Sequence, residues 1–450
     1  MLQDIDRHRA VIASRTAYPT RGGTYPHVVS GSGPYVTSQD GTTYLDASGG
    51  SGSLIFGHGD AEMVGVLAAQ AGTLTLFPSR SLGVEIVERY IGELVDFAPA
   101  GLDRALTFTS GSDAVEAAIK LAIHYHFASG RPERAKVIGR RGSYHGNTLA
   151  GLGAGGFLGR RKPYEKALGQ VAKAASAHCA ACEFGHAAGA CEVDCASSIE
   201  AAVLAEGPDT VAAVIVEPIV GAALSAAVPD TRYLARVREI CDRYGILLIF
   251  DEVMTGFGRT GHRFGCEIWE VIPDILVCGK AMSAGYFPLS GVLASLRVAE
   301  AFETGEGPFQ NGHTHACSPV GAAVGLEVLK RLREPDLLEN VRRLGASLRE
   351  RLQDGDLAEV IRDVRGEGLM IGFDIRRQPG HRQSRPGEAA DGFQRAALRR
   401  GLIIYASSGG AGTTAGDHAM LLPPLTIGPA EIDGIVESLL AAARAVMRPE

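Results

Sequence analysis

The chain has 450 residues, and 44 Lys and Arg against 51 Asp and Glu give it a formal net charge of −7. This mildly acidic balance argues against a nucleic-acid partner or a polybasic contact with membranes, and no apolar stretch is long and uncharged enough to predict a membrane span. The first ten residues lack the apolar core of a signal peptide, so we expect a cytoplasmic protein with mostly reduced thiols.

The first informative segment is "ALTFTSGSDAV", residues 105–115. Its apolar start predicts a short strand, "SGS" predicts a tight turn, and a helix is expected to begin near Asp113 with Ser110 or Ser112 as its N-cap. The backbone N–H groups of Gly111 and Ser112 at such a helix N-terminus would hold a phosphate. An ordinary capped helix without a ligand fits the same motif.

The next segments carry weaker signals. "GLGAGG" at residues 151–156 has the spacing G-x-G-x-x-G, but no apolar strand precedes it and no acidic residue follows at the expected distance, so we exclude a dinucleotide site. The segment 178–195 contains four cysteines, Cys179, Cys182, Cys191 and Cys195. They could bind zinc or form a reversible disulfide, but we favour a packed loop and predict no metal site.

The middle of the chain alternates apolar runs with a helical pattern. "TVAAVIVEP" (210–218), "ILLIFDEV" (246–253) and "DILVCGK" (274–280) predict buried strands, and "RYLARVREICDRYG" (232–245) predicts an amphipathic helix between the first two. This βαβ pattern predicts a parallel sheet flanked by helices.

The sequence pattern changes near Ala322, where charged amphipathic helices are predicted to begin. Two strand-like runs follow, "GLMIGFDI" (368–375) and "GLIIYASS" (401–408), and the last helix carries apolar residues at helical spacing from Ile432 to Leu439. The polar stretch 376–392 and the Gly-rich stretch 407–418 predict loops. These features predict a second, smaller α+β domain.

Three ionisable side chains stand at the ends of the predicted parallel strands: Glu217, Asp251 and Lys280. Ligands of open α/β sheets bind beyond the carboxyl ends of the strands, so we expect the three to converge. A buried Asp251 needs a cationic partner, and a protonated pyridine nitrogen would serve. A lysine can form a Schiff base with an aldehyde. A pyridine aldehyde that also carries a phosphate would therefore use Asp251, Lys280 and the Gly111–Ser112 turn together.

These residues lie in motifs that resemble the class III pyridoxal-phosphate-dependent aminotransferases, also called the ω-aminotransferase family. The resemblance covers nearly the whole chain. Its longest block is "LLIFDEVMTGFGRTGHRFGCEIWEVIPDILVCGKAMSAGYFPLSGVLAS", and "SGSDAVEAAIKLA", "GSYHGNT", "IVEPIVG", "NGHTHACSPVGAAVG" and "LLPPLTI" occur with it in the family's order. The resemblance implies an α/β fold of the aspartate-aminotransferase type, with a large, mostly parallel sheet domain, a smaller α+β domain and active sites at a dimer interface.

The resemblance also implies roles for individual residues. Lys280 would form the Schiff base and carry the proton, and Asp251 would hold the pyridinium proton of pyridoxal phosphate. Glu217 would lie near the phenolic edge of the ring. The other cofactor contacts would come from Gly111 and Ser112 on the phosphate, Tyr144 and Val253 on the two ring faces, His145 beside Tyr144, and Thr314 of the partner subunit on the phosphate.

The sequence departs from the family where the substrate binds. Many relatives carry an arginine in "I-R-x-x-P-P-L" that holds an α-carboxylate, and Met420 stands in its place here. Arg80 or Arg141 could substitute for that arginine. We expect Ser53, Phe77 and Met420 to face the substrate.

From these patterns we predict an N-terminal segment (1–60) that contributes to the small domain and the active-site rim, a cofactor-binding domain (61–321) and a C-terminal small domain (322–450). The predicted activity is ping-pong transfer of an amino group from a primary amine or ω-amino acid to a keto acid such as pyruvate, by a homodimer or a dimer of dimers. A phospho-lyase, racemase or decarboxylase on the same fold, or a non-catalytic zinc-holding scaffold, are the alternatives.

Overall fold

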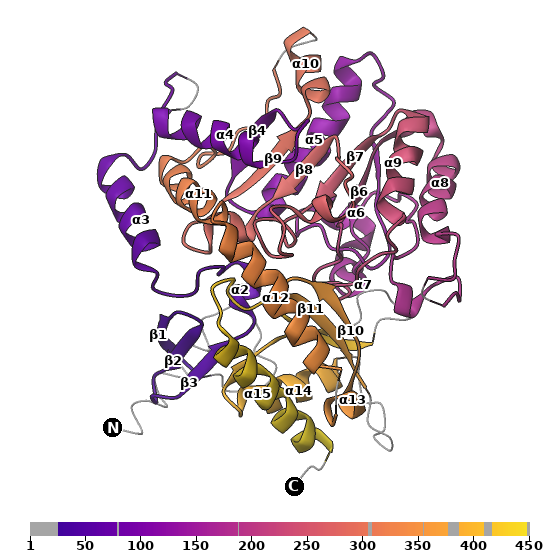
Figure 1. The fold of residues 1–450 in the computed structure, drawn as a ribbon. Coiled ribbons are helices and arrows are strands. Elements are labelled where there is room, and N and C mark those ends of the chain that lie inside the picture. Colours follow the sequence, from indigo (N-terminus) through magenta and orange to yellow (C-terminus); the bar gives the residue numbers. More distant parts are fainter. Residues whose placement is uncertain are drawn as a thin grey trace.

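The computed structural model describes residues 26–78, 81–187, 189–304, 308–353, 355–376, 387–408 and 416–447. Figure 1 shows a large sheet with its helices in the upper part of the molecule and two smaller sheets with the C-terminal helices in the lower part. Helices α11 (Pro319–Leu332) and α12 (Pro335–Arg351) run between these two parts. The proposed division at residues 60 and 321 stays a prediction.

The largest sheet has six strands in the order β4-β9-β8-β7-β6-β5. Strands β5 to β8 pair in parallel, whereas β9 is antiparallel to both of its neighbours. The sheet is therefore mixed and mostly parallel, as the βαβ pattern predicted. Its strands are β4 (Arg104–Phe108), β5 (Lys136–Ile138), β6 (Val211–Val216), β7 (Leu247–Asp251), β8 (Ile275–Cys278) and β9 (Ser290–Ala294).

Every residue of β6, β7 and β8 is buried, because helices cover both faces of the sheet. Alternate residues point to opposite faces: Ile215 and Ile249 pack with helix α5 (Gly111–Ala128), while Val216 and Phe250 pack in the core that contains α9 (Tyr233–Tyr244). Residues 217 and 251 have the same parity as 215 and 249. Strand geometry thus directs both carboxylates toward the α5 side of the sheet.

The remaining helices of the upper part surround this sheet or connect its strands (Figure 1). Among the described residues they are α3 (Ala61–Thr73), α4 (Glu85–Phe97), α6 (Leu149–Ala154), α7 (Leu158–Arg161), α8 (Asp194–Glu206) and α10 (Leu296–Thr304), with short 3-10 turns at Lys162–Ala167, Cys179–Ala181, Pro208–Thr210, Gly265–Ile268 and Lys280–Ser283. The short helix α2 (Gly49–Gly52) lies at the junction with the lower part (Figure 1).

Two four-stranded sheets form the lower part, one in the order β1-β2-β3-β12 and the other in the order β10-β11-β14-β13. Helices α14 and α15 pack against each other beside them. The elements are β1 (Val28–Ser32), β2 (Tyr35–Ser38), β3 (Thr43–Asp46), β10 (Ile361–Glu367), β11 (Met370–Ile375), β12 (Leu402–Ile403), β13 (Tyr405–Ser408), β14 (Asp417–Leu421), α13 (Leu357–Val360), α14 (Glu388–Leu398) and α15 (Pro429–Met447).

The run 401–408 does not form the single strand that its composition predicted. Leu402 and Ile403 pair in parallel with β3, and Tyr405 to Ser408 pair with β14 in the other sheet. The buried residue Ile404 separates the two pairings. Local apolar character indicated a strand here, but the partners that divide it come from distant parts of the chain.

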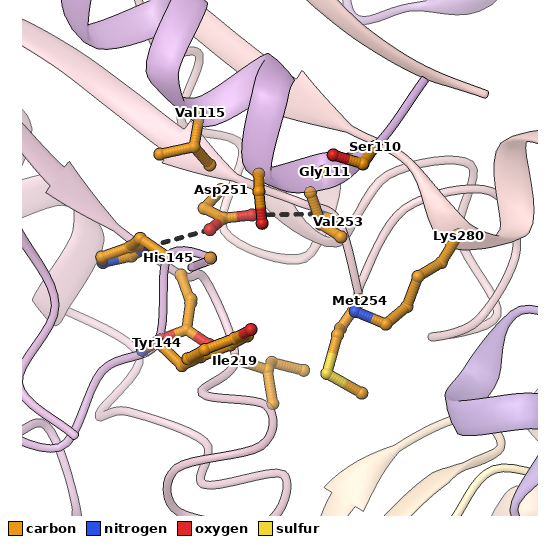
Figure 2. Close-up of a pocket in the computed structure, with 13 residues that line it drawn as sticks. Ser110, Gly111, Val115, Tyr144, His145, Ile219, Asp251, Val253, Met254 and Lys280 are labelled. Atoms are coloured by element: carbon orange, nitrogen blue, oxygen red, sulfur yellow. Dashed lines mark hydrogen bonds and ion pairs between the residues drawn. The ribbon is translucent and has the colours of Figure 1, made fainter. Parts of the chain in front are cut away.

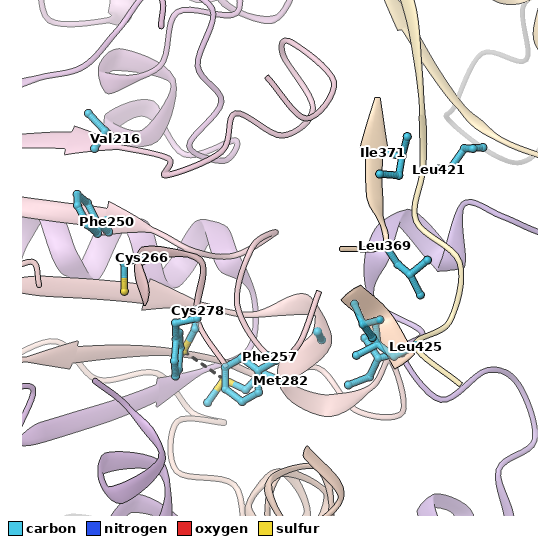
Figure 3. Packing of buried hydrophobic residues seen from close by; sticks show 14 of the residues in the cluster. Val216, Phe250, Phe257, Cys266, Cys278, Met282, Leu369, Ile371, Leu421 and Leu425 are labelled. Carbon is cyan, nitrogen blue, oxygen red and sulfur yellow. Dashed lines mark hydrogen bonds between the residues drawn. The ribbon is translucent and has the colours of Figure 1, made fainter. Parts of the chain in front are cut away.

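A continuous hydrophobic core joins the two parts of the molecule. It includes Val216 and Phe250 of the large sheet and Ile371 and Leu421 of the small one (Figure 3). Phe257 packs between them in the same cluster. The edge of the large sheet that carries Asp251 therefore has a fixed position relative to β14, and with it to residue 420.

Candidate active site

A cavity of about 140 Å³ opens at the carboxyl ends of β6, β7 and β8. Figure 2 shows its lining side chains converging from the strand ends, the start of α5 and the loop 140–148. The lining consists of Ser110, Gly111, Ser112, Val115, Tyr144, His145, Gly146, Glu217, Ile219, Asp251, Val253, Met254 and Lys280. This is the edge of the sheet at which the sequence predicted Glu217, Asp251 and Lys280 to meet.

The N-terminus of α5 faces this cavity. Ser110, not Ser112, is the N-cap, and its hydroxyl oxygen accepts a hydrogen bond from the Asp113 N–H at 3.2 Å. The hydroxyl oxygen of Ser112 instead accepts from the backbone N–H of Asn147 at 3.0 Å. This contact holds the loop 140–148 beside the helix start, and the free N–H groups of an 18-residue helix favour an anion there.

Gly111 allows a neighbouring side chain to pack closely against the first turn of α5. A Cβ added to Gly111 would lie 2.9 Å from Cγ1 of Val253, which is too close for a carbon contact. Because Gly111 lacks a side chain, Val253 packs directly on the first turn of α5. Val253 then forms one wall of the cavity, with Tyr144 at a different side of it (Figure 2).

Asp251 ends β7 as a buried carboxylate with two hydrogen-bond partners. Its Oδ2 lies 2.8 Å from Nδ1 of His145, and its Oδ1 accepts from the Val253 N–H at 3.1 Å. His145 is also buried, and its Nε2 has no hydrogen-bond partner among the described residues. A negative charge fixed in this way suits a cationic ring nitrogen placed in the cavity.

Lys280 follows β8 and begins a short 3-10 turn, with a left-handed φ of 43°. This φ is uncommon for a residue with a side chain. The side chain extends into the cavity, and its amino group points toward the centre (Figure 2). Burial lowers the pKa of Lys280, although Asp251 and Glu217 oppose that shift. The neutral amine is the form that attacks a carbonyl carbon.

Glu217 lies beside the loop 140–148. Its carboxylate accepts hydrogen bonds from the Tyr144 N–H at 3.2 Å and from the Gly221 N–H at 3.0 Å. Burial raises the pKa of Glu217, and the nearby charge of Asp251 acts in the same direction. Burial also raises the pKa of the Tyr144 phenol, which therefore stays protonated as a possible donor.

The donor set fits pyridoxal phosphate. An anion site at the start of α5, a carboxylate for a ring nitrogen, apolar and aromatic side chains for the ring faces, and an amine for an aldehyde all line one cavity. The residues expected to contact the cofactor are brought together there, with the exception of Thr314. That residue is exposed and does not line the cavity in the single chain.

The predicted substrate residues do not line the cavity. Ser53 and Phe77 are partly buried, and Phe77 packs against the large core. Met420 is fully buried in an apolar cluster with Ile219, which does line the cavity. Met420 therefore supports an apolar wall from behind instead of presenting its own side chain.

Of the two arginines proposed as substitutes, only Arg141 lies in the described part of the chain, and it does not line the cavity. Arg80 lies outside the described residues. Arg141 pairs through its Nε with Glu183 at 2.8 Å, so it faces the cysteine-bearing segment. Arg160 was not identified from the sequence: its guanidinium lies over the Tyr144 ring, 4.7 Å from the centroid. No motif marks that position, and only the contact with Tyr144 brings it to the site.

The cysteine-bearing segment is held by polar contacts. The thiols of Cys179, Cys182, Cys191 and Cys195 are all free, and no group of three or more metal-binding side chains occurs among the residues that the structure describes. The two histidines of the segment lie beside aspartates, His178 by Asp363 and His186 by Asp194. Within the same described parts, no helix is both long enough and apolar enough to cross a membrane.

Comparisons with known proteins agree with this geometry. The sequence model of the family described as Aminotransferase class-III matches residues 19–443. An omega-aminotransferase of Caulobacter vibrioides is 30% identical over 416 residues, which cover 91% of each chain.

Solved structures give the same result. An (S)-enantioselective omega-transaminase from Thermomicrobium roseum superimposes with a TM-score of 0.87 at 31% identity and 99% coverage of each chain. An amine transaminase from an uncultivated Pseudomonas species, solved in its PLP-bound form, gives 0.85 at 32% identity, with 96% of this chain and 99% of that one covered. With this fold and a match over almost its whole length, the chain belongs to the class III aminotransferases and is a pyridoxal-phosphate-dependent transaminase.

Proposed function

We propose that this transaminase moves an amino group from a primary amine or an ω-amino acid to a keto acid such as pyruvate by a ping-pong cycle. Pyridoxal phosphate, when bound, supplies the aldehyde that takes up the amino group and the ring that draws electrons from the substrate carbon. The observation that carries the proposal is the convergence of Lys280, Asp251 and the start of α5 on one cavity.

The proposed roles follow from the contacts of each side chain. Gly111 and Ser112 offer backbone N–H groups to the phosphate, and Asp251 holds the proton on the ring nitrogen. His145 keeps the Asp251 carboxylate oriented through the 2.8 Å contact. Val253 and Tyr144 would hold the two faces of the ring, and Glu217 would lie near its edge.

Lys280 supplies the amine and moves the proton during transfer. Its lowered pKa supports this role, because an amine that loses its proton easily can both attack a carbonyl carbon and accept a proton. Thr314 would reach the phosphate from the partner subunit of a dimer. Its exposure in the single chain leaves it free to do so.

The donor class is proposed from the wall around Met420. Methionine cannot hold an α-carboxylate, and the cluster that buries it extends to Ile219 and Met254 in the cavity lining. The wall is therefore apolar where relatives with the arginine carry a positive charge. Donors without an α-carboxylate should bind better there than α-amino acids, and Ser53 and Phe77 remain proposed substrate contacts.

Isomeric donors test this proposal sharply. β-Alanine and L-alanine have the same atoms and charge, and they differ in the carbon that bears the amine; propylamine adds a donor without a carboxylate. With pyruvate as acceptor, we expect higher kcat/KM for β-alanine and propylamine than for the α-amino acid donor L-2-aminobutyrate. The cofactor spectrum and product analysis report the half-reaction of each donor. Preference for L-alanine and L-2-aminobutyrate would refute the donor class.

The position of the reactive amine needs its own experiment. Borohydride reduction of the holoenzyme followed by peptide mapping should find the cofactor on Lys280. Lys173 is the natural competitor, because burial lowers its pKa to about 8, and it lies in a different cavity. Label on Lys173, or on no lysine, would end the assignment to Lys280.

A further inference from the structure

We propose that Arg160 binds the carboxylate of the keto-acid acceptor at the mouth of the cavity, in place of the arginine that is missing at position 420. The inference rests on the proposed function, since it names a substrate contact within the same site. It explains how one site can favour donors without an α-carboxylate and still accept a keto acid.

Two aromatic rings place Arg160 beside the cavity. Its guanidinium carbon lies 4.7 Å from the centroid of the Tyr144 ring and 5.3 Å from that of Phe157. The two rings are themselves packed edge to face, with centroids 6.5 Å apart. Tyr144 lines the cavity, so the guanidinium lies beside one of its walls, although Arg160 itself is not among the lining residues. Cation–π contacts fix the position of a guanidinium without using its N–H donors.

The donors of Arg160 are available. Its side chain is exposed, and in the described parts of the chain no carboxylate pairs with it. The neighbouring arginines are engaged elsewhere: Arg140 donates to the carbonyl oxygen of Glu217, Arg141 pairs with Glu183, and the Nη1 of Arg161 donates to three carbonyl oxygens. Among these four arginines, Arg160 is thus the one whose planar edge has no carboxylate or carbonyl partner in the described parts of the chain.

The charge of Arg160 reaches the reacting groups. It lowers the pKa of Lys280, and it opposes the rise that burial causes in the pKa of Tyr144. Both effects agree with the position of the guanidinium 4.7 Å from the centroid of the Tyr144 ring, which lines the cavity that the Lys280 amine enters (Figure 2). A carboxylate held by Arg160 would therefore belong to a molecule whose other end reaches the centre of the site.

Strand β14 offers no substitute cation. Met420 is fully buried, and His418, two residues before it on the same side of the strand, is buried as well. Burial lowers the pKa of His418 to about 4, so its ring is neutral at physiological pH. With no cation on β14, we assign the positive partner of a carboxylate to Arg160, whose guanidinium contacts the cavity-lining ring of Tyr144.

The variant Arg160→Gln tests the proposal in the holoenzyme. With butylamine as donor, KM for pyruvate should rise about tenfold to a hundredfold, as expected for loss of a hydrogen-bonded charge. KM for propanal, an acceptor without a carboxylate, should stay within about twofold. Arg160→Lys keeps the charge but not the bidentate geometry, so its KM for pyruvate should lie between those of the wild type and Arg160→Gln. Arg141→Gln is the matched control, because that exposed arginine lies 19 positions before Arg160 in the chain and pairs with Glu183 of the cysteine-bearing segment.

A binding measurement separates this inference from the proposed function. Propionate does not react, and calorimetric titration of the holoenzyme should show weaker propionate binding for Arg160→Gln and unchanged binding of uncharged propionamide. If pyruvate were not an acceptor, the proposed function would be wrong. The propionate titration would still show whether Arg160 binds a carboxylate. An equal loss for pyruvate and propanal, a pyruvate-specific loss in Arg141→Gln, or unaltered propionate binding in Arg160→Gln would each overturn the assignment.

Discussion

Asp251 shows how a single residue depends on its surroundings. A carboxylate at the end of a fully buried strand is costly unless its oxygens are partnered. Here His145 and the Val253 N–H partner both oxygens, and the open side of the group faces the cavity. The carboxylate can therefore accept one more positively charged partner from the cavity. The sequence analysis predicted that this partner is a protonated pyridine nitrogen.

We expect Asp251→Asn to keep the fold and lose activity by about a hundredfold or more, because an amide cannot balance the charge on the ring nitrogen. The amide oxygen can still accept from the Val253 N–H, so the melting temperature should change little. Turnover is measured with bound cofactor verified by absorbance. Near-normal kcat in a fully loaded variant would refute the role of Asp251.

At the scale of elements, helix α5 and the residues around its start position most of the site. Ser110 caps the helix, Ser112 binds the loop 140–148, and Gly111 lets Val253 approach. Ser290 of the neighbouring strand β9 also donates to the Ser110 carbonyl oxygen at 2.7 Å. The geometry of the proposed anion site thus depends on contacts between separate elements, and not on the helix alone.

The variant Gly111→Ala should weaken cofactor binding, because its new Cβ would lie 2.9 Å from a methyl group of Val253 and displace the wall of the cavity. The double variant Gly111→Ala with Val253→Ala removes that methyl group and should recover part of the affinity. Cofactor dissociation constants of the wild type, both single variants and the double variant give the coupling. Additive losses, with no recovery in the double variant, would contradict the steric explanation.

Helix α5 is also joined to the sheet by a buried histidine. Nε2 of His126 lies 2.9 Å from the carbonyl oxygen of Ala212, and burial lowers the pKa of His126 to about 4, with Arg131, Arg134 and Arg297 acting in the same direction. Protonation of the His126 ring is therefore less favourable in the folded protein than in the unfolded chain, where its pKa is near 6.5. The stability that comes from the neutral ring is complete above pH 6.5 and is lost as the pH falls toward 4.

His126→Gln should remove this part of the pH dependence, because glutamine can donate to the same carbonyl oxygen without titrating. Between pH 6.5 and 4 the wild type should lose up to about 3 kcal/mol of unfolding free energy more than the variant. Urea unfolding at several pH values measures the difference. Parallel pH curves for the two proteins would show that His126 does not titrate on unfolding in this range.

At the scale of the whole molecule, the segment with Thr314 stands apart from the cavity that it is expected to complete. Thr314 is exposed and lines no part of the cavity, although the segment is anchored by a 3.0 Å hydrogen bond from the Cys317 N–H to the Thr107 hydroxyl. This arrangement is consistent with a dimer in which each subunit lends a threonine to the other.

Mixing two inactive variants tests such sharing. Lys280→Ala lacks the reactive amine, and Thr314→Asp places a negative charge where the phosphate of the partner's site is expected. In a heterodimer of the two, one site has an intact Lys280 and an intact Thr314, so activity should return when subunits exchange. Exchange is verified by differently tagged chains, and the separate variants are the controls. Absence of rescue after verified exchange would argue against a crossing threonine.

Much of the fold could be read from local patterns. The apolar runs around 211–216, 247–251 and 275–278 predicted buried parallel strands, because only sheets covered on both faces require residues without polar alternation. Strands β10 and β14 were missed, since the charged residues of β10 and the His418–Met420 stretch of β14 show no such signal. Their pairing with β11 compensates for weak local preference.

The sequence by itself determined the cofactor edge, because strand ends, turn chemistry and the identities of Asp251 and Lys280 are local properties of short segments. Only the tertiary structure decided the surroundings of the residues proposed to contact the substrate. It buried Met420, directed Arg141 to Glu183 and placed Arg160 over Tyr144. These outcomes depend on side chains that meet across separate loops and sheets, and no spacing along the chain encodes such contacts.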